Sequence, residues 1–170
     1  MSNGLPLTPA AVAAAKFKAH LEKLYTNEDM ADPRLAYTLL DDLNAVIPIL
    51  ARKGEDEDLF YVRLGAEHYD AYPPLVTFVE PDSWAPAAPE SRWFPKIEGA
   101  PNFGLHDTYE YKRTAEKRPL ICFSFNADYY VTDHNPTPGQ TWVQGNHTVA
   151  ATIYRLTEIM QTYYTGRRVS

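Results

Sequence analysis

Helical periodicity is clear in only two stretches of this chain, one near each end. The first follows Thr8 and Pro9, which predict its start, and its apolar positions are Ala13, Phe17, Leu21 and Leu24. The second is capped by Asn146 or Thr148 and is predicted to end at Gly166; its apolar positions are Val149, Ile153, Leu156, Met160 and Tyr163. Each helix has one apolar face, so each needs a sheet or another helix to cover it.

The residues after the first helix predict strands. Short β-branched and aromatic runs at 45–51, 59–64 and 75–79 indicate three of them, and Pro48 places the first at a sheet edge or a bulge. Residues 35–43 fit a strand or a helix equally, and 54–58 form a polar turn. Because the connections are too short for parallel crossovers, we expect an antiparallel meander.

A proline-rich region at 82–104 follows the meander and is predicted to be an extended loop rather than sheet. Trp84 and Trp93 within it are expected to pack the loop onto the body of the protein, although aromatic residues are also enriched at partner surfaces. A short apolar segment at 120–125 then precedes the last helix. This order predicts an α+β fold in a single domain over residues 1–170.

The charge and composition exclude several classes of protein. A net charge of -6, with only three short basic pairs, argues against nucleic acid as a partner. No apolar stretch approaches the roughly 18–20 residues that cross a bilayer, and the start shows no signal peptide, so we expect no membrane association. One cysteine cannot form an intramolecular disulfide, and the expected localisation is cytoplasmic.

That single cysteine, Cys122, is the strongest candidate for chemistry. If residues 120–125 are extended, Leu120, Cys122 and Ser124 share one face, and the more apolar Ile121, Phe123 and Phe125 share the other. The thiol is therefore predicted to point away from the core. The alternative is that Cys122 is a small buried hydrophobe, which is the commoner role of a free cysteine.

Several motifs resemble those of the ubiquitin-conjugating (E2) family. The run 59–64, the turn at 68–72 and the Pro73-Pro74 approach to 75–78 are similar to an E2 strand, its turn and the next strand. Pro119-Leu120-Ile121-Cys122 is similar to the segment that carries the E2 nucleophile. Trp142 and the helix at 148–156 resemble the tryptophan and helix that follow it. The resemblance spans about residues 8–165.

The resemblance implies a UBC-like fold and an enzyme that carries a ubiquitin-like modifier as a Cys122 thioester. Its implied partners are an E1-like activating enzyme, the modifier and a protein target. The His-Pro-Asn motif of eukaryotic E2s is absent: His106-Asp107 lies further upstream of the cysteine, Asn102 precedes it, and no oxyanion residue is assigned. The long interval from Cys122 to Trp142 is similar to divergent bacterial E2-like proteins, which implies a conjugation pathway in antiviral defence.

The residues proposed to assist Cys122 are histidines and aspartates. His106, Asp133 and His134 are the chosen candidates, with Asp133-His134 preferred because a loop after the cysteine can fold back over it. Ordinary polar loop residues are an equally good interpretation. The histidine spacing, with His147, matches no standard zinc pattern, so no metal or cofactor is expected. The alternatives to a transferase are a non-catalytic UBC-fold module that binds a ubiquitin-like protein and, more weakly, a histidine- and aspartate-based hydrolase.

Overall fold

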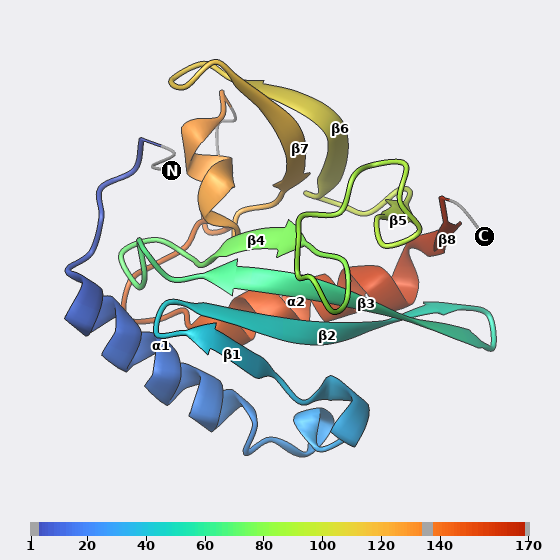
Figure 1. The fold of residues 1–170 in the computed structure, drawn as a ribbon, viewed down its shortest axis with the longest axis horizontal. Coiled ribbons are helices and arrows are strands. Elements are labelled where there is room, and N and C mark those ends of the chain that lie inside the picture. The colour runs from blue at the N-terminus through green and yellow to red at the C-terminus, as the bar shows by residue number, and fades with distance from the viewer. Residues whose placement is uncertain (1–3, 134–137, 169–170) are drawn as a thin grey trace.

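The computed structural model describes residues 4–133 and 138–168 and has an α+β architecture of helices and antiparallel sheets (Figure 1). Its α-helices and 3-10 turns are α1 (Ala10–Leu24), η1 (Glu28–Met30), η2 (Pro33–Leu35), η3 (Ala127–Val131) and α2 (Val149–Thr162). Its strands are β1 (Thr38–Asp41), β2 (Asn44–Lys53), β3 (Asp56–Gly65), β4 (Leu75–Phe78), β5 (Pro95–Ile97), β6 (Gly104–Tyr111), β7 (Glu116–Cys122) and β8 (Tyr164–Arg167).

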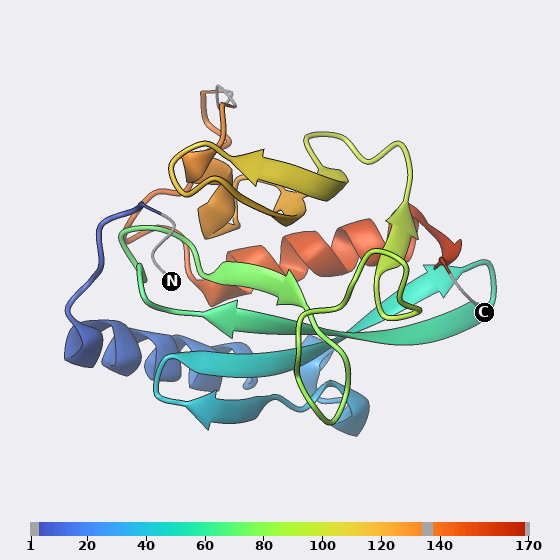
Figure 2. The same cartoon turned by 45° about the horizontal axis from the view of Figure 1, so that its top comes forward.

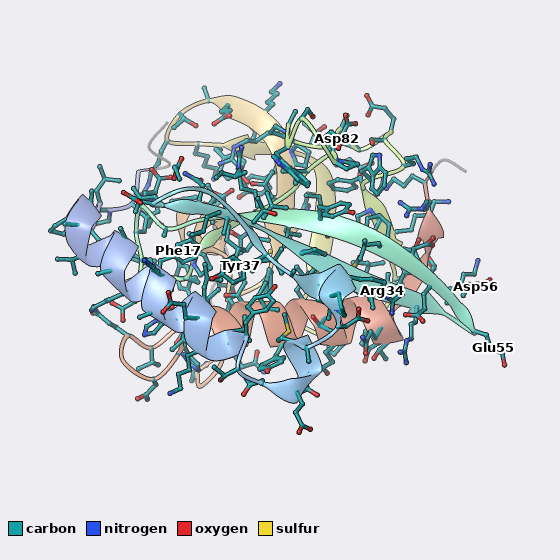
Figure 3. The ribbon with its side chains drawn as sticks, turned by 60° about the horizontal axis from the view of Figure 1, so that its bottom comes forward. Phe17, Arg34, Tyr37, Glu55, Asp56 and Asp82 are labelled. Atoms are coloured by element: carbon teal, nitrogen blue, oxygen red, sulfur yellow. The ribbon has the colours of Figure 1, made fainter. Side chains whose placement is uncertain are left out.

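The main sheet is an antiparallel meander in the order β1-β2-β3-β4, as the short connections predict. Its two long strands, β2 and β3, pair continuously from Asn44 opposite Gly65 to Lys53 opposite Asp56. The turn between them projects from the body, and Figure 3 shows its polar residues Glu55 and Asp56 at the tip. Helix α2 packs against one face of this sheet, and α1 packs against α2.

The two helices bury the faces that their periodicity predicts. All four expected apolar positions of α1 are buried. Three of them, Phe17, Leu21 and Leu24, share one core with four of the five positions of α2 and with residues of β3. Phe17 of α1 contacts the ring of Tyr69 at 5.8 Å between centroids, which ties the helix to the β3–β4 connection. Apolar burial is therefore what holds the main body together.

The predicted helix ends are correct at one position and wrong at two. Thr148 caps α2, because its side chain accepts a hydrogen bond from the Ala150 N–H. Thr8 does not cap α1: the helix begins one residue later than predicted, with Pro9 as its cap and no side-chain bond. Gly166 does not end α2 either, since that helix stops at Thr162 and Gly166 lies within β8.

The middle of the chain contains strands that the sequence did not predict. Residues 35–43 resolve into the end of η2 and the edge strand β1. Pro48 lies in β2 beyond Val46, the last residue that β1 pairs, so the prediction of an edge position holds there. The proline-rich region is not wholly loop, because β5 pairs with β8. As predicted, Trp84 and Trp93 pack this region onto the body, both against Tyr61, at 5.4 and 5.9 Å between ring centroids.

Strands β6 and β7 form a hairpin that places the cysteine. Both views show the hairpin and η3 beyond the β4 edge of the main sheet, at the opposite side from β1 (Figures 1 and 2). β6 carries mostly exposed polar residues, and therefore lacks the apolar alternation that identifies a strand in sequence. Of the apolar segment at 120–125, residues 120–122 form the end of β7 and residues 123–125 follow the strand. We call β6, β7 and η3 together the cap.

Candidate active site around Cys122

Cys122 is the last residue of β7 and lies directly opposite Gly104 of β6. The predicted alternation is correct: Ile121 and Phe123 belong to the main core, whereas Leu120 and Cys122 belong to a small separate cluster with Tyr111. The thiol thus points away from the main core and into the cap. Its neighbours come from two parts of the cap, the hairpin and the segment that follows the cysteine.

The thiol is more covered than a freely accessible nucleophile would be. Cys122 is 7 % exposed, and Tyr109, Tyr129 and Val131 pack against its cluster. Burial raises the pKa of the Cys122 thiol to about 11. At that pKa about one thiol in ten thousand is ionised at pH 7, so the reactive form needs either a nearby base or displacement of the cover.

The aromatic ring of Tyr129, in η3, packs against the small cluster that contains Cys122. Burial raises the pKa of its phenol, and the charge of an ionised Cys122 raises the pKa further, which places the two groups close together. Tyr129 remains partly exposed, with its ring 5.4 Å from that of Tyr130. A partly exposed phenol can donate a hydrogen bond to an oxygen that approaches the sulfur.

His106 lies on the same face of the hairpin as Cys122. It pairs with Leu120, and residues directly opposite each other on paired strands share a face, as Gly104 and Cys122 do. A Cβ added to Gly104 would lie 3.9 Å from Nε2 of His106, so the imidazole extends over the glycine opposite the cysteine. His106 is exposed to solvent at this point.

The other candidates are less directly placed. Asp133 is exposed and forms an ion pair with Lys112 at the hairpin turn, at 2.6 Å between carboxylate and ammonium. His134 lies outside the described residues, so the preferred Asp133-His134 pair stays a prediction. Nδ1 of His147 accepts a hydrogen bond from the Val143 N–H at 2.8 Å and has a local structural role. Asn102 is exposed at a turn, with a φ of 54°.

A buried polar latch holds η3 against the hairpin. The carboxylate of Asp128 is 2 % exposed and accepts two hydrogen bonds from the Arg118 guanidinium, at 2.5 and 3.1 Å. The Tyr111 hydroxyl donates to the same carboxylate at 3.2 Å, and the guanidinium lies 4.0 Å from the centre of the Tyr111 ring. Burial and then the charge of Asp128 raise the pKa of Tyr111. We call Arg118, Asp128 and Tyr111 the latch.

Asn126 joins the cap to the main sheet and was not singled out as a site residue from the sequence. Its buried amide donates to the Ile121 C=O at 2.8 Å, and its side-chain oxygen accepts from the Val76 N–H of β4 at 2.9 Å. The latch and Tyr129 were also missed as functional residues. The available signal was Arg118, which shares a strand face with Leu120 and Cys122, and the polar-aromatic run that directly follows the cysteine.

Within 4–133 and 138–168 no group of three or more histidine, cysteine, aspartate or glutamate side chains could hold a metal ion. No helix in the same ranges has the length and apolar character to cross a membrane. The chain matches no protein-family model, and no curated protein matches it. We therefore infer the function from the geometry around Cys122 and from the order of the structural elements.

Proposed function

We propose that this chain is a UBC-like, E2-type transferase that carries a ubiquitin-like modifier as a thioester on Cys122. The main support is the position of its single cysteine. Cys122 ends β7 on the face turned away from the main core, beside His106 and Tyr129. The element order supports the proposal, because a helix, a four-stranded antiparallel meander, a cysteine-bearing segment and a helix beneath the sheet follow one another as the resemblance implies.

The reaction has two transfers. In the first, the Cys122 thiolate attacks the thioester carbonyl that joins the modifier to an E1-like enzyme; the new C–S bond forms and the E1 thiolate leaves. In the second, an amine of the protein target attacks the Cys122 thioester, a C–N bond forms, and the Cys122 thiolate leaves as the amine loses a proton. Neither step needs a redox partner or a metal.

His106 and Tyr129 supply two functions that these steps require. The imidazole of His106 accepts the proton from the thiol or from the incoming amine. The Tyr129 hydroxyl donates a hydrogen bond to the oxyanion that develops on the modifier's carbonyl, in place of the missing asparagine motif. Asp133 and His134 remain further candidates for orienting the amine.

The burial of the thiol gives this enzyme a specific requirement. Because Cys122 is 7 % exposed beneath Tyr129, the tail of a modifier reaches the sulfur only after that ring moves. Binding of the E1-like enzyme or of the modifier to the cap would supply that movement. The Cys122 thiol is therefore expected to react slowly in the isolated protein and rapidly in the presence of its partners.

The test is thioester formation with matched partners. A matched E1-like enzyme and ubiquitin-like protein, together with ATP, should give an adduct that reducing agent removes. Cys122→Ala should abolish the adduct, and Cys122→Ser should give an oxyester that resists reducing agent. His106→Gln should slow transfer to an amine without abolishing loading. The absence of an adduct with an active E1-like enzyme would contradict the proposal.

The burial of Cys122 favours a second candidate function, a non-catalytic module that binds a ubiquitin-like protein. The raised pKa of the thiol is what a structural cysteine would have. This function predicts that calorimetry gives the same affinity for the modifier with wild type and Cys122→Ala, and that no thioester forms. Loss of binding in a folded Cys122→Ala protein would count against it.

A further inference from the structure

A buried hydroxyl joins α1 to the first residue of α2 through two hydrogen bonds. Nδ1 of His20 lies 2.6 Å from the Tyr69 hydroxyl oxygen, and the same oxygen accepts a hydrogen bond from the Val149 N–H at 2.9 Å. Tyr69 is fully buried, and its hydroxyl has no third partner among the residues that the structure describes. We call His20, Tyr69 and Val149 the relay.

The chemistry of the three groups fixes where the protons of the relay lie. A backbone N–H can only donate, so the Val149 N–H takes the accepting side of the Tyr69 hydroxyl. The Tyr69 O–H must then donate to Nδ1 of His20, and a ring nitrogen accepts a hydrogen bond only when it carries no proton. In the relay His20 is therefore neutral, with its single ring proton on Nε2.

A second proton on the imidazole is incompatible with this arrangement. It would make Nδ1 of His20 a donor, so the Tyr69 hydroxyl would face two donors and its own proton would lack an acceptor among the described residues. A buried hydroxyl without an acceptor is unfavourable. His20 is only partly buried, so on gaining a proton its ring can turn away from Tyr69 toward solvent.

The surroundings of His20 also favour its neutral form. Burial is the largest influence and lowers the pKa of His20; Asp70 raises it, and Lys16 and Lys23 lower it, which leaves the pKa below the usual 6.5. Lys16 is paired with Asp70 at 2.8 Å, so the effects of these two charges on the imidazole oppose each other. The helix α2 presents the positive end of its dipole to the relay, which adds to the cost of a charged imidazole.

We propose that His20 is a proton-sensitive contact, which holds α1 to the first turn of α2 at neutral pH and releases it in mildly acidic solution. Tyr69 links this contact to the cap, because its ring lies 6.0 Å from that of Trp142 and the Trp142 backbone N–H donates to the Tyr130 hydroxyl of η3 at 2.8 Å. Release of His20 therefore loosens a point where α1, α2 and the segment that leaves the cap meet. The relay does not involve the Cys122 sulfur, so it stands apart from the transfer chemistry.

The test measures hydrogen exchange of the Val149 amide in the full ¹⁵N-labelled chain at about pH 5 and about pH 7.5, which bracket the range of histidine. Because the relay needs neutral His20, its contribution is present at the higher pH and is lost as the pH falls. Protection of Val149, taken relative to the intrinsic exchange rate at each pH, should be about threefold or more lower at the acid pH. Amides in the middle of α2 should keep their protection, which separates release of the relay from global unfolding.

Two variants assign the effect to His20. His20→Asn keeps an acceptor near the position of Nδ1 but does not titrate, so Val149 protection should be nearly the same at both pH values. His147, two residues before Val149, remains in that variant, so any effect of its own protonation would persist there. Lys18→Gln, an exposed change on α1, is the matched control and should behave as wild type does.

A measurement on the unchanged protein keeps the proposal open to refutation even if His20→Asn does not fold. The ¹⁵N resonances of the His20 ring at about pH 7.5 should show the proton on Nε2 and none on Nδ1. A proton on Nδ1 of neutral His20 would overturn the proposal. Equal Val149 protection of wild type at the two pH values, or a fall in His20→Asn as large as in wild type, would overturn it as well.

Discussion

The main body and the cap are held together in different ways. The body is an apolar core between α2 and the four-stranded sheet, to which α1 adds its own apolar face. The cap encloses a much smaller apolar cluster, within which the Arg118–Asp128 pair holds η3 to the hairpin. Ile121 of the hairpin packs in the main core, and Asn126 bonds to both β7 and β4. Apolar packing gives global stability, whereas a few directional contacts fix one local arrangement. We therefore expect η3 to open from the hairpin more easily than the body unfolds.

The largest effect is expected in the body. Leu156→Ala removes a fully buried side chain of α2 and should lower the free energy of unfolding by about 2–5 kcal/mol. Urea denaturation measures it, with the exposed Gln161→Ala on the same helix as the control. A loss no larger than the control's would show that the core is not where stability resides.

The latch should give a smaller global effect and a larger local one. Asp128→Asn keeps the shape but removes the charge that Arg118 faces, and should cost about 1–3 kcal/mol. Because η3 then loosens, alkylation of Cys122 by iodoacetamide should accelerate about tenfold, beyond what global unfolding allows. Asp133→Asn, which breaks only the exposed pair with Lys112, is the matched control and should change neither quantity. Unchanged alkylation in Asp128→Asn would mean that the latch does not control access.

The raised pKa of Cys122 predicts a pH dependence of stability. The folded thiol binds its proton more tightly than the unfolded one, so its contribution is present below about pH 9 and is lost as pH rises toward about 11. Between about pH 9 and pH 11 the free energy of unfolding of wild type should fall on the order of 1–2 kcal/mol more than that of Cys122→Ala. Subtracting the two curves cancels the contribution of the groups that both proteins share. Parallel stability curves for the two proteins would contradict the burial of the thiol.

Tyr129 should affect access with the smallest change in stability. Tyr129→Ala removes the cover and should accelerate alkylation of Cys122 severalfold, with a lowered thiol pKa in the rate–pH profile, while the free energy of unfolding changes by less than about 1 kcal/mol. Tyr129→Phe keeps the ring and should leave the alkylation rate near that of wild type. Equal rates in wild type and Tyr129→Ala would show that the ring does not cover the sulfur.

The body was largely predictable from sequence, because its elements have regular periodicity. Phe17 and Leu156 lie on helix faces that the spacing identifies, and the strands at 45–51, 59–64 and 75–79 lie within β2, β3 and β4 apart from Val79. Gly166 was wrong as a helix end because a glycine with positive φ also suits an irregular strand.

The cap was predictable only at Cys122. The alternation along β7 gave the direction of the thiol, since Ile121 and Phe123 are both apolar and both buried in the main core. The cover by Tyr129 and the bridge by Asn126 depend on contacts between segments that carry no shared pattern in the sequence. His106 was a candidate by residue type alone, and its position over Gly104 comes from the β6–β7 register.

The most direct measurement for the central claim is a non-reducing gel of this chain with a matched E1-like enzyme, its modifier and ATP. We predict one new band at the summed mass, which thiol reductant removes and which is absent in Cys122→Ala. A matched, active E1-like enzyme that loads its own cysteine yet leaves wild type and Tyr129→Ala both unmodified would contradict it.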